Sequence, residues 1–201
     1  MSARRLASSR RWSCANGQSV VEFALVLPFV LVLSLGVVEA GYALLDEHIV
    51  TKLSREGSNL ISRNTSLQDA ATALRSMSSR PVNFDDGSSK VIFSVLKNVS
   101  TPGASNYGRP ILYQRYEYGS LPAQSALGTH GAGSFGGDPD HRATNPNGDT
   151  NLQITNLPPN VAVPVGGFVY VTEIYSRHVA ITPVDALGVI MPGRLYSVAY
   201  F

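Results

Sequence analysis

The residues whose types and spacing could do chemistry lie close to the N-terminus. Gly17 and Gln18 are followed by Glu22 and Phe23 at the start of a long apolar run. A glycine leaves the backbone open to a peptidase, and cleavage after Gly17 would give Gln18 a free α-amine about one helical turn from Glu22. An amine and a carboxylate attract strongly where little water screens them. We therefore predict a processing site at Gly17 and Gln18. We also predict a subunit-assembly contact at Glu22 and Phe23, with Glu22 paired to an amine of its own chain or of a neighbouring chain.

A second interpretation of Glu22 needs no partner. Burying a carboxylate in lipid costs about 3 kcal/mol or more, but the cost falls near the interface, where Glu22 could simply reach the lipid headgroups. The residues themselves leave both interpretations open.

Other chemistry finds little support in the sequence. It contains no GxSxG, P-loop or HExxH motif. Cys14 is its only cysteine, and the residues before Cys14 do not resemble a lipoprotein signal. The acidic and histidine residues of the glycine-rich segment 128–150 fit neither an EF-hand nor a helical zinc pair, and turn formation explains them better. We expect no enzymatic activity, no cofactor and no metal site.

Two further histidines have plain interpretations. His48 stands beside Asp46 and Glu47, and we interpret the three as a solvated, charged helix face. His178 follows a predicted strand, and we interpret it as structural.

Basic charge is concentrated before the apolar run. The net charge of the chain is only +2, and the first 17 residues hold four arginines and no acid: Arg4, Arg5, Arg10 and Arg11. A basic leader favours a cytoplasmic N-terminus and a C-terminal domain outside the cytoplasm. The rest of the chain has no basic cluster of the kind that binds nucleic acid, so we expect no nucleic-acid partner.

The apolar run is long enough to cross a membrane. From Phe23 to Val38 no residue is charged, and after Glu39 the stretch Ala40–Leu45 is uncharged again. A helix over 23–45 would be about 35 Å long, enough to span a bilayer core in contact with lipid. We predict one transmembrane helix over 18–45; the alternative is a buried core helix.

Two features within this run bear on its shape and packing. Pro28 removes one backbone hydrogen bond and predicts a kink. Gly36 and Ala40 form a small-xxx-small pair that would let another helix approach closely, so we predict helix packing there.

The periodicity beyond residue 45 predicts an α+β fold. Helical spacing continues to residue 61, and a capping box at Ser66 opens a second amphipathic helix. The pattern then changes to a period of two in four segments: 90–96, 111–118, 167–179 and 195–201. We predict a long N-terminal helix, half membrane-spanning and half amphipathic, packed on a small antiparallel sheet. The expected organisation is a cleaved leader (1–17), a transmembrane helix (18–45), an amphipathic helical region (46–80) and a β-rich head (81–201) with the glycine-rich loop 128–150.

With these residues in view, the N-terminal region resembles a known family. The basic leader ending in Gly17, the segment GQSVVEF and the apolar run after it look like a type IV prepilin-like signal. Residues 15–62, including REGSNLISR, are similar to the TadE-like family of tight-adherence (Tad) pilus minor pilins, or pseudopilins. Further on, only VPVGGFVYVTEIY and the tyrosine-rich C-terminus resemble the family, and the glycine-rich insert departs from it.

The resemblance implies a role in a bacterial surface fibre. It implies cleavage after Gly17 by a prepilin peptidase, and partnership with other pilin subunits, a secretion ATPase and the Tad inner-membrane platform. The expected location is the bacterial inner membrane, with a single pass, a cytoplasmic N-terminus and a periplasmic head, or incorporation into an extracellular adhesive pilus. The alternative is an uncleaved single-span membrane protein that displays a β-rich binding module.

Overall fold

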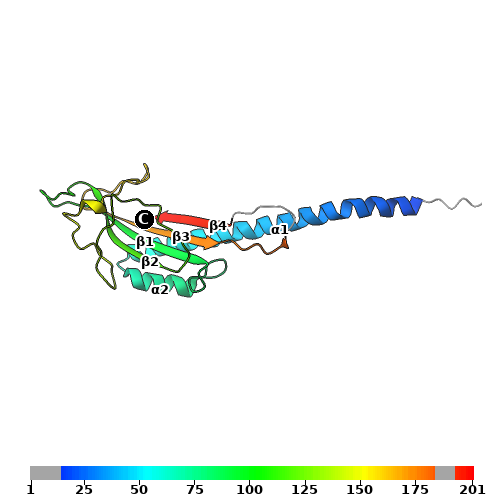
Figure 1. Ribbon diagram of the computed structural model, residues 1–201, viewed down its shortest axis with the longest axis horizontal. Coiled ribbons are helices and arrows are strands. Elements are labelled where there is room, and N and C mark those ends of the chain that lie inside the picture. The colour runs from blue at the N-terminus through cyan, green and yellow to red at the C-terminus, as the bar shows by residue number, and fades with distance from the viewer. Residues whose placement is uncertain (1–14, 184–192) are drawn as a thin grey trace, which may run out of the picture.

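The computed structural model describes residues 15–183 and 193–201. Within these residues it has two α-helices, one short 3-10 turn and a four-stranded sheet. Helix α1 (Ala15–Ser62) runs without interruption through Pro28, and its N-terminal half projects away from the head (Figure 1). Its C-terminal half packs on the sheet. The predicted α+β class, with a long N-terminal helix on an antiparallel sheet, is confirmed.

The head-packing half of α1 buries one stripe at helical spacing. The buried side chains recur every three or four residues, as an amphipathic helix requires; they are Val50, Leu53, Ser54, Ser58 and Ile61. The two small serines let the helix lie close to the sheet, and both also bond to its last strand. Ser54 Oγ lies 2.9 Å from Ser197 Oγ, and Ser58 Oγ donates to the Ala199 carbonyl at 2.9 Å.

Helix α2 (Leu67–Met77) begins at the predicted cap. The Asp69 amide donates to Ser66 Oγ at 3.1 Å, and Ser66 Oγ donates to the Asp69 carboxylate at 2.6 Å. This reciprocal contact satisfies an amide that the first helical turn leaves without a backbone acceptor. The apolar face of α2 packs into the same core as α1.

The sheet is antiparallel throughout and its strand order is β2-β1-β3-β4. Each predicted strand is present, with no end shifted by more than two residues: β1 (Ser89–Asn98), β2 (Pro110–Tyr118), β3 (Phe168–Arg177) and β4 (Arg194–Tyr200). The register shifts at Val95 and Leu96, where β1 pairs with β2. Strands β2 and β4 are therefore the two edges of the sheet.

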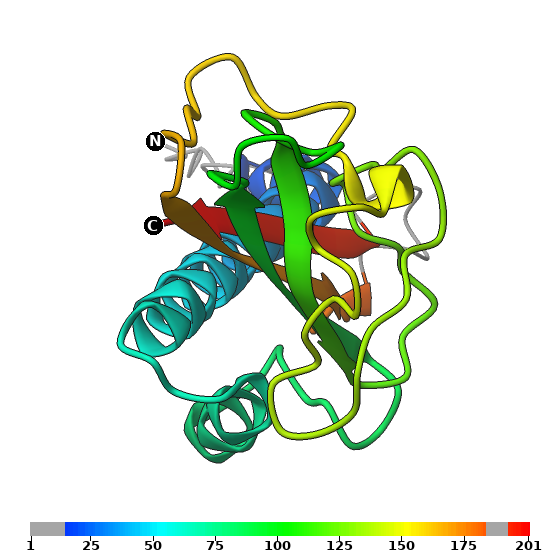
Figure 2. The same cartoon turned by 90° about the vertical axis from the view of Figure 1, so that its left-hand side faces the viewer.

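The two faces of the sheet are covered differently. Figure 2 shows α1 and α2 on one side and the long connecting loops on the other. On the helix side, Phe93 and Ile174 are buried against Val50 and Leu74. On the loop side, a second cluster joins sheet residues to residues of the loops: Leu96, Leu112, Leu127, Val163 and Val171.

Gly57 allows the closest contact between α1 and the sheet. A Cβ at this position would lie 2.6 Å from Thr172 Cγ2 and 3.1 Å from Leu74 Cδ1. Thr172 is fully buried on β3, so a larger residue would force the helix away. Gly57 weakens α1 locally by propensity but is required by the packing.

The glycine-rich segment 128–150 is irregular, as predicted, but it is more than a surface loop. It buries Ala143 and runs beside β2, where the Ala143 amide donates to the Tyr113 carbonyl at 2.7 Å. The 3-10 turn η1 (Thr150–Leu152) follows and buries Leu152. Main-chain hydrogen bonds need no particular side chains, so a glycine-rich segment can still cover a sheet edge.

Candidate assembly site on the N-terminal helix

The predicted processing and assembly residues lie on the first turns of α1. Gly17, Gln18, Glu22 and Phe23 are all exposed on the free end of the helix. The Gln18 side-chain amide donates to the Glu22 carboxylate at 3.0 Å, so positions 18 and 22 share one face. A carboxylate has about four lone-pair sites, which leaves Glu22 capacity for a further donor. The predicted leader up to residue 14, with its four arginines and Cys14, lies outside the described residues.

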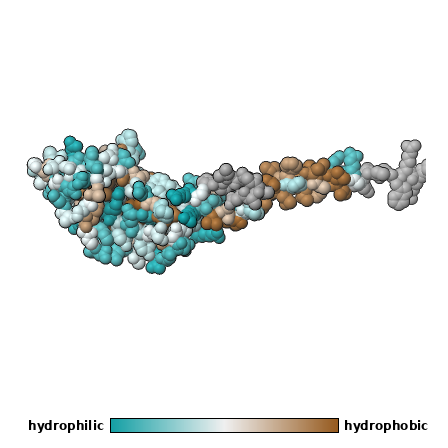
Figure 3. Space-filling model, in the orientation of Figure 1, coloured by the Kyte–Doolittle hydropathy of each residue, from teal (hydrophilic) through white to brown (hydrophobic). Residues whose placement is uncertain are grey.

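An open apolar surface follows this end of the helix. The exposed fractions reach 71% at Phe29, 70% at Leu33 and 73% at Val37. In Figure 3 the brown, hydrophobic part of the helix contrasts with the mostly hydrophilic head. In water such a surface is strongly unfavourable, so another apolar phase must cover it.

This helix is also the one candidate membrane span among the described residues. It is long and apolar enough to cross a membrane, and none of its most apolar stretch is buried in the fold. A buried core helix, the alternative drawn from the sequence, does not match that exposure. One long apolar N-terminal helix suggests a single-pass membrane protein.

The predicted helix-packing pair lies on α1, where the described residues make no close contact with Gly36. Gly36 is half-buried and Ala40 is exposed. A Cβ built on Gly36 would meet nothing within 4 Å. The described residues therefore leave room for a helix to approach at Gly36, and packing at Gly36 and Ala40 stays a prediction.

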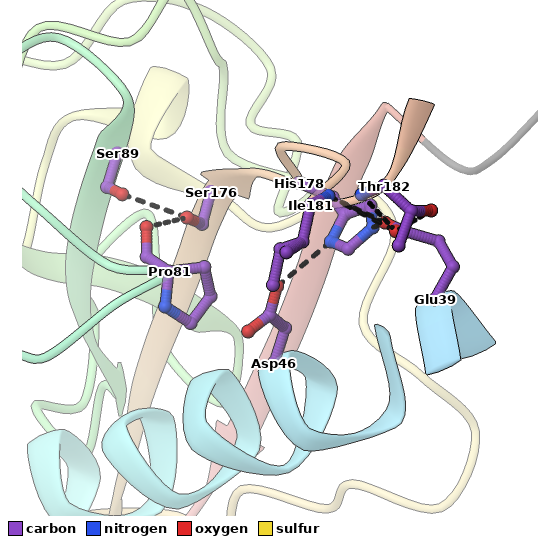
Figure 4. Close-up of polar contacts among 8 residues, drawn as sticks. All are labelled: Glu39, Asp46, Pro81, Ser89, Ser176, His178, Ile181 and Thr182. Carbon is purple, nitrogen blue, oxygen red and sulfur yellow. Dashed lines mark hydrogen bonds and ion pairs between the residues drawn. The ribbon is translucent and has the colours of Figure 1, made fainter. Parts of the chain in front are cut away.

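Where the apolar run ends, Glu39 of α1 forms hydrogen bonds with the head (Figure 4). Glu39 is fully buried although it follows the apolar run. Its carboxylate accepts the amides of Ile181 at 3.1 Å and of Thr182 at 2.8 Å, and the Thr182 hydroxyl at 2.7 Å. These donors replace the water that an ionised carboxylate needs, which is how a buried charge becomes tolerable.

His178 connects Glu39 to a second acid on the same helix face. Its Nδ1 lies 2.9 Å from Asp46 Oδ2, and its Nε2 lies 3.4 Å from Glu39 Oε1. The Nε2 distance suits an ion pair, but the atom makes no hydrogen bond within the described residues. The ring therefore lies between two carboxylates of the same helix. We call Glu39, Asp46, His178, Ile181 and Thr182 the juxtamembrane latch, because they join the head to α1 beside the apolar run.

The latch corrects one interpretation drawn from the sequence. Asp46 is not on a solvated face: it is 9% exposed and bonds to His178, whereas Glu47 and His48 are exposed as expected. His178 is buried and structural, as predicted. Reasoning from the sequence missed Glu39 and Asp46 as a pair. Their spacing of seven residues, which places both on one helix face, was a signal that could have found them.

A second buried carboxylate lies on the loop side of the sheet. Glu173 is fully buried and accepts hydrogen bonds from the Ser125 hydroxyl, the Ala126 amide at 2.7 Å and the Tyr196 hydroxyl at 3.1 Å. Arg115 reaches the same Ser125 hydroxyl at 3.0 Å. Burial, and then the charge of Glu173, raise the pKa of Tyr175 to about 12. Every donor around Glu173 fixes a loop or strand, so this cluster anchors the segment around residues 125–127.

The described residues contain no group of three or more histidine, cysteine or acidic side chains suited to a metal ion. The residues that stand out structurally are instead the apolar half of α1, with Glu22 near its tip, and the latch beside that half. The apolar half of α1 can insert into a membrane. The latch can then hold the head against α1 in a fixed orientation.

Comparison with known proteins agrees with this arrangement. Residues 17–59 match the family described as TadE-like protein. This range contains Gly17, Glu22, Gly36 and Glu39 and extends into the head-packing half of α1. Neither the curated proteins nor the solved structures gave a match to the chain. The resemblance expected from the N-terminal motif is thus confirmed over residues 17–59, and a TadE-like segment on an apolar N-terminal helix is consistent with a protein associated with a Tad pilus.

Proposed function

We propose that this chain is a minor pilin or pseudopilin of a Tad pilus assembly and secretion system. A prepilin peptidase cleaves it after Gly17, and α1 anchors it in the bacterial inner membrane with a periplasmic head. It supports pilus biogenesis and adhesion alongside other pilin subunits and the inner-membrane platform. The observation that carries the proposal is the exposed apolar half of α1, with Glu22 near its tip, inside the segment that matches the TadE-like family.

The role of Glu22 in this proposal is electrostatic. Cleavage after Gly17 would place a new amine on Gln18, a residue that already lies on the Glu22 face. In a low-dielectric setting an amine and a carboxylate of adjacent protomers attract strongly, and their pairing would set the axial stagger of packed helices. The exposed Ala40 and the open space at Gly36 support close helix contact further along the same interface.

The proposal is tested by replacing Glu22 with alanine. The variant should insert into the membrane normally but fail to enter the fibre, because the neighbour's amine loses its partner. The matched control is Glu47→Ala, which removes an exposed acid of the same helix beyond the apolar run. Both variants are followed by membrane fractionation and by the amount of chain in sheared surface fibres. Normal incorporation of Glu22→Ala would contradict the assembly role.

The second candidate is an uncleaved single-span protein that displays its head as a binding module. It is favoured by the exposed edge strand of the head, described below. Intact-mass measurement of membrane-extracted protein separates the two candidates. Loss of the first 17 residues, leaving Gln18 first, supports the pilin role, whereas retention of the arginine-rich leader supports the binding module.

A further inference from the structure

The two edges of the sheet differ in how their backbone groups are used. The outer edge of β2 is covered by the segment 141–154. The Arg115 amide donates to the His141 carbonyl at 3.4 Å, and the Ile154 amide donates to the Pro110 carbonyl at 3.1 Å, in addition to the bond between residues 143 and 113. Isolated bridges join β2 to this segment at Gln153 and Arg142 as well. This edge cannot accept another strand.

Among the residues that the structure describes, no segment covers the outer edge of β4 in this way. Tyr170 and Phe201 exchange both backbone hydrogen bonds, at 3.0 and 2.9 Å. In an antiparallel ladder, bonded pairs alternate with pairs whose N–H and C=O groups point outward. With this register, the outward groups belong to Tyr196, Val198 and Tyr200. Within the described residues no other segment bonds to these groups, so β4 presents a row of free donors and acceptors.

The surroundings of this edge define the strand that would fit it. On the helix side, a groove of about 520 Å³ runs between α1 and the end of β4, lined by Arg55, Glu56, Asn59 and Arg63. Two of these side chains are positively charged and one is negatively charged, so the four lining side chains carry a net positive charge. On the loop side, the edge carries the side chains of Tyr196, Val198 and Tyr200. Because side chains of an added strand alternate between faces, one set would meet cations and the other an aromatic and aliphatic surface.

The direction of β4 bears on whether a second copy could pair there. Contacts of Ser54 with Ser197 and of Ser58 with Ala199 show that β4 runs in the same direction as α1. A symmetric antiparallel pair of β4 strands would therefore set the two α1 helices in opposite directions. Two such anchors could not enter one bilayer from the same side. The other edge, on β2, is covered in every copy.

We propose that the outer edge of β4 is a docking site for an extended strand of a different polypeptide, with side chains that alternate between apolar and acidic. The backbone of that strand pairs with the outward groups of Tyr196, Val198 and Tyr200. Its acidic side chains lie in the groove beside Arg55 and Arg63, and its apolar side chains lie against the tyrosines. This mode gives affinity through main-chain bonds and specificity through alternate side chains.

The test uses the full chain in detergent micelles and two labelled octapeptides, one alternating valine with glutamate and one alternating valine with lysine. Fluorescence anisotropy should show the glutamate peptide binding at least about tenfold more tightly than the lysine peptide, because only the former complements the groove. A glutamate peptide with N-methylated valines keeps the side chains but loses main-chain donors, and it should bind about tenfold more weakly or worse.

Two variants of the protein locate the site. Val198→Pro removes an outward N–H that the β3–β4 ladder does not use, and it should weaken binding of the glutamate peptide about tenfold. The double variant Arg55→Glu and Arg63→Glu leaves the strand intact and should reverse the preference between the two peptides. The circular dichroism spectrum checks that each variant is folded. If Val198→Pro does not fold, the peptide preference of the double variant tests the proposal by itself.

Several results would overturn the proposal. These are absence of binding by the glutamate peptide, equal binding of both peptides, insensitivity to N-methylation, and an unchanged preference in the charge-reversed variant. A dimer in sedimentation that disappears with Val198→Pro would instead assign the edge to a second copy of this chain, and it would also refute the inference.

Discussion

Replacing His178 with alanine should loosen the head from α1. The imidazole is almost completely buried, and its Nδ1 lies 2.9 Å from the Asp46 carboxylate. A hydrogen bond to a charged group contributes about 1.5–3 kcal/mol, and a buried partner left without it adds a desolvation penalty. From the Asp46 contact alone we expect a loss of about 2–4 kcal/mol of unfolding free energy, or roughly 30- to 900-fold in the unfolding equilibrium constant.

Two measurements test the expected loss of stability in His178→Ala. Denaturant titration of the full chain in detergent, followed by the near-ultraviolet circular dichroism of its tyrosines, reports the stability of the head. Hydrogen exchange at the amides of Ile181 and Thr182 reports the latch itself, since both donate to Glu39. These amides should lose protection in His178→Ala before the strands do.

The matched control is His48→Ala, because His48 is exposed on the same helix. It should change the unfolding free energy by no more than about 0.5 kcal/mol. If His178→Ala behaves like this control, and the exchange of Ile181 and Thr182 is unchanged, the latch does not hold the head and the reasoning from its contacts is wrong.

Three further predictions concern local features. Ser66→Ala removes the α2 cap and should cost about 1 kcal/mol in the same titration; an unchanged midpoint would exclude a role for that cap. Gly57→Ala should cost about 1–3 kcal/mol through overpacking against Thr172, whereas Gly41→Ala, whose added methyl meets nothing within 4 Å, should cost nothing; equal effects would refute the close-approach argument. Because the pKa of Tyr175 is raised to about 12 and an unfolded tyrosine ionises near pH 10, the folded state retains its proton longer. The stability from Tyr175 should then be complete below about pH 10 and lost as pH rises toward 12. Burial also raises the pKa of Tyr116, Tyr196 and Tyr200, so Tyr175→Phe should remove one late-ionising phenol from the absorbance titration and leave the others. An unchanged number of late-ionising phenols would contradict the assignment to Tyr175.

Much of the fold could be predicted from the order of residues along the chain. The apolar run, the serine cap at Ser66 and the change from helical to alternating periodicity are local patterns. Each follows from the geometry of a single helix or strand, which repeats within a few residues. The same local reasoning identified Gly17 and Glu22 as candidate assembly residues, because that prediction depends only on their spacing within one helix.

The tertiary structure decided what those elements do together. Asp46 and His178 are 132 positions apart, and nothing near either residue in sequence indicates that they meet. Glu39 appeared as an isolated acid at the end of an apolar run until the segment around residues 181–182 supplied its hydrogen-bond donors. The strand order, the cover over β2 and the open edge of β4 were likewise beyond prediction. Such contacts depend on how distant segments close on one another, and local periodicity carries no information about that closure.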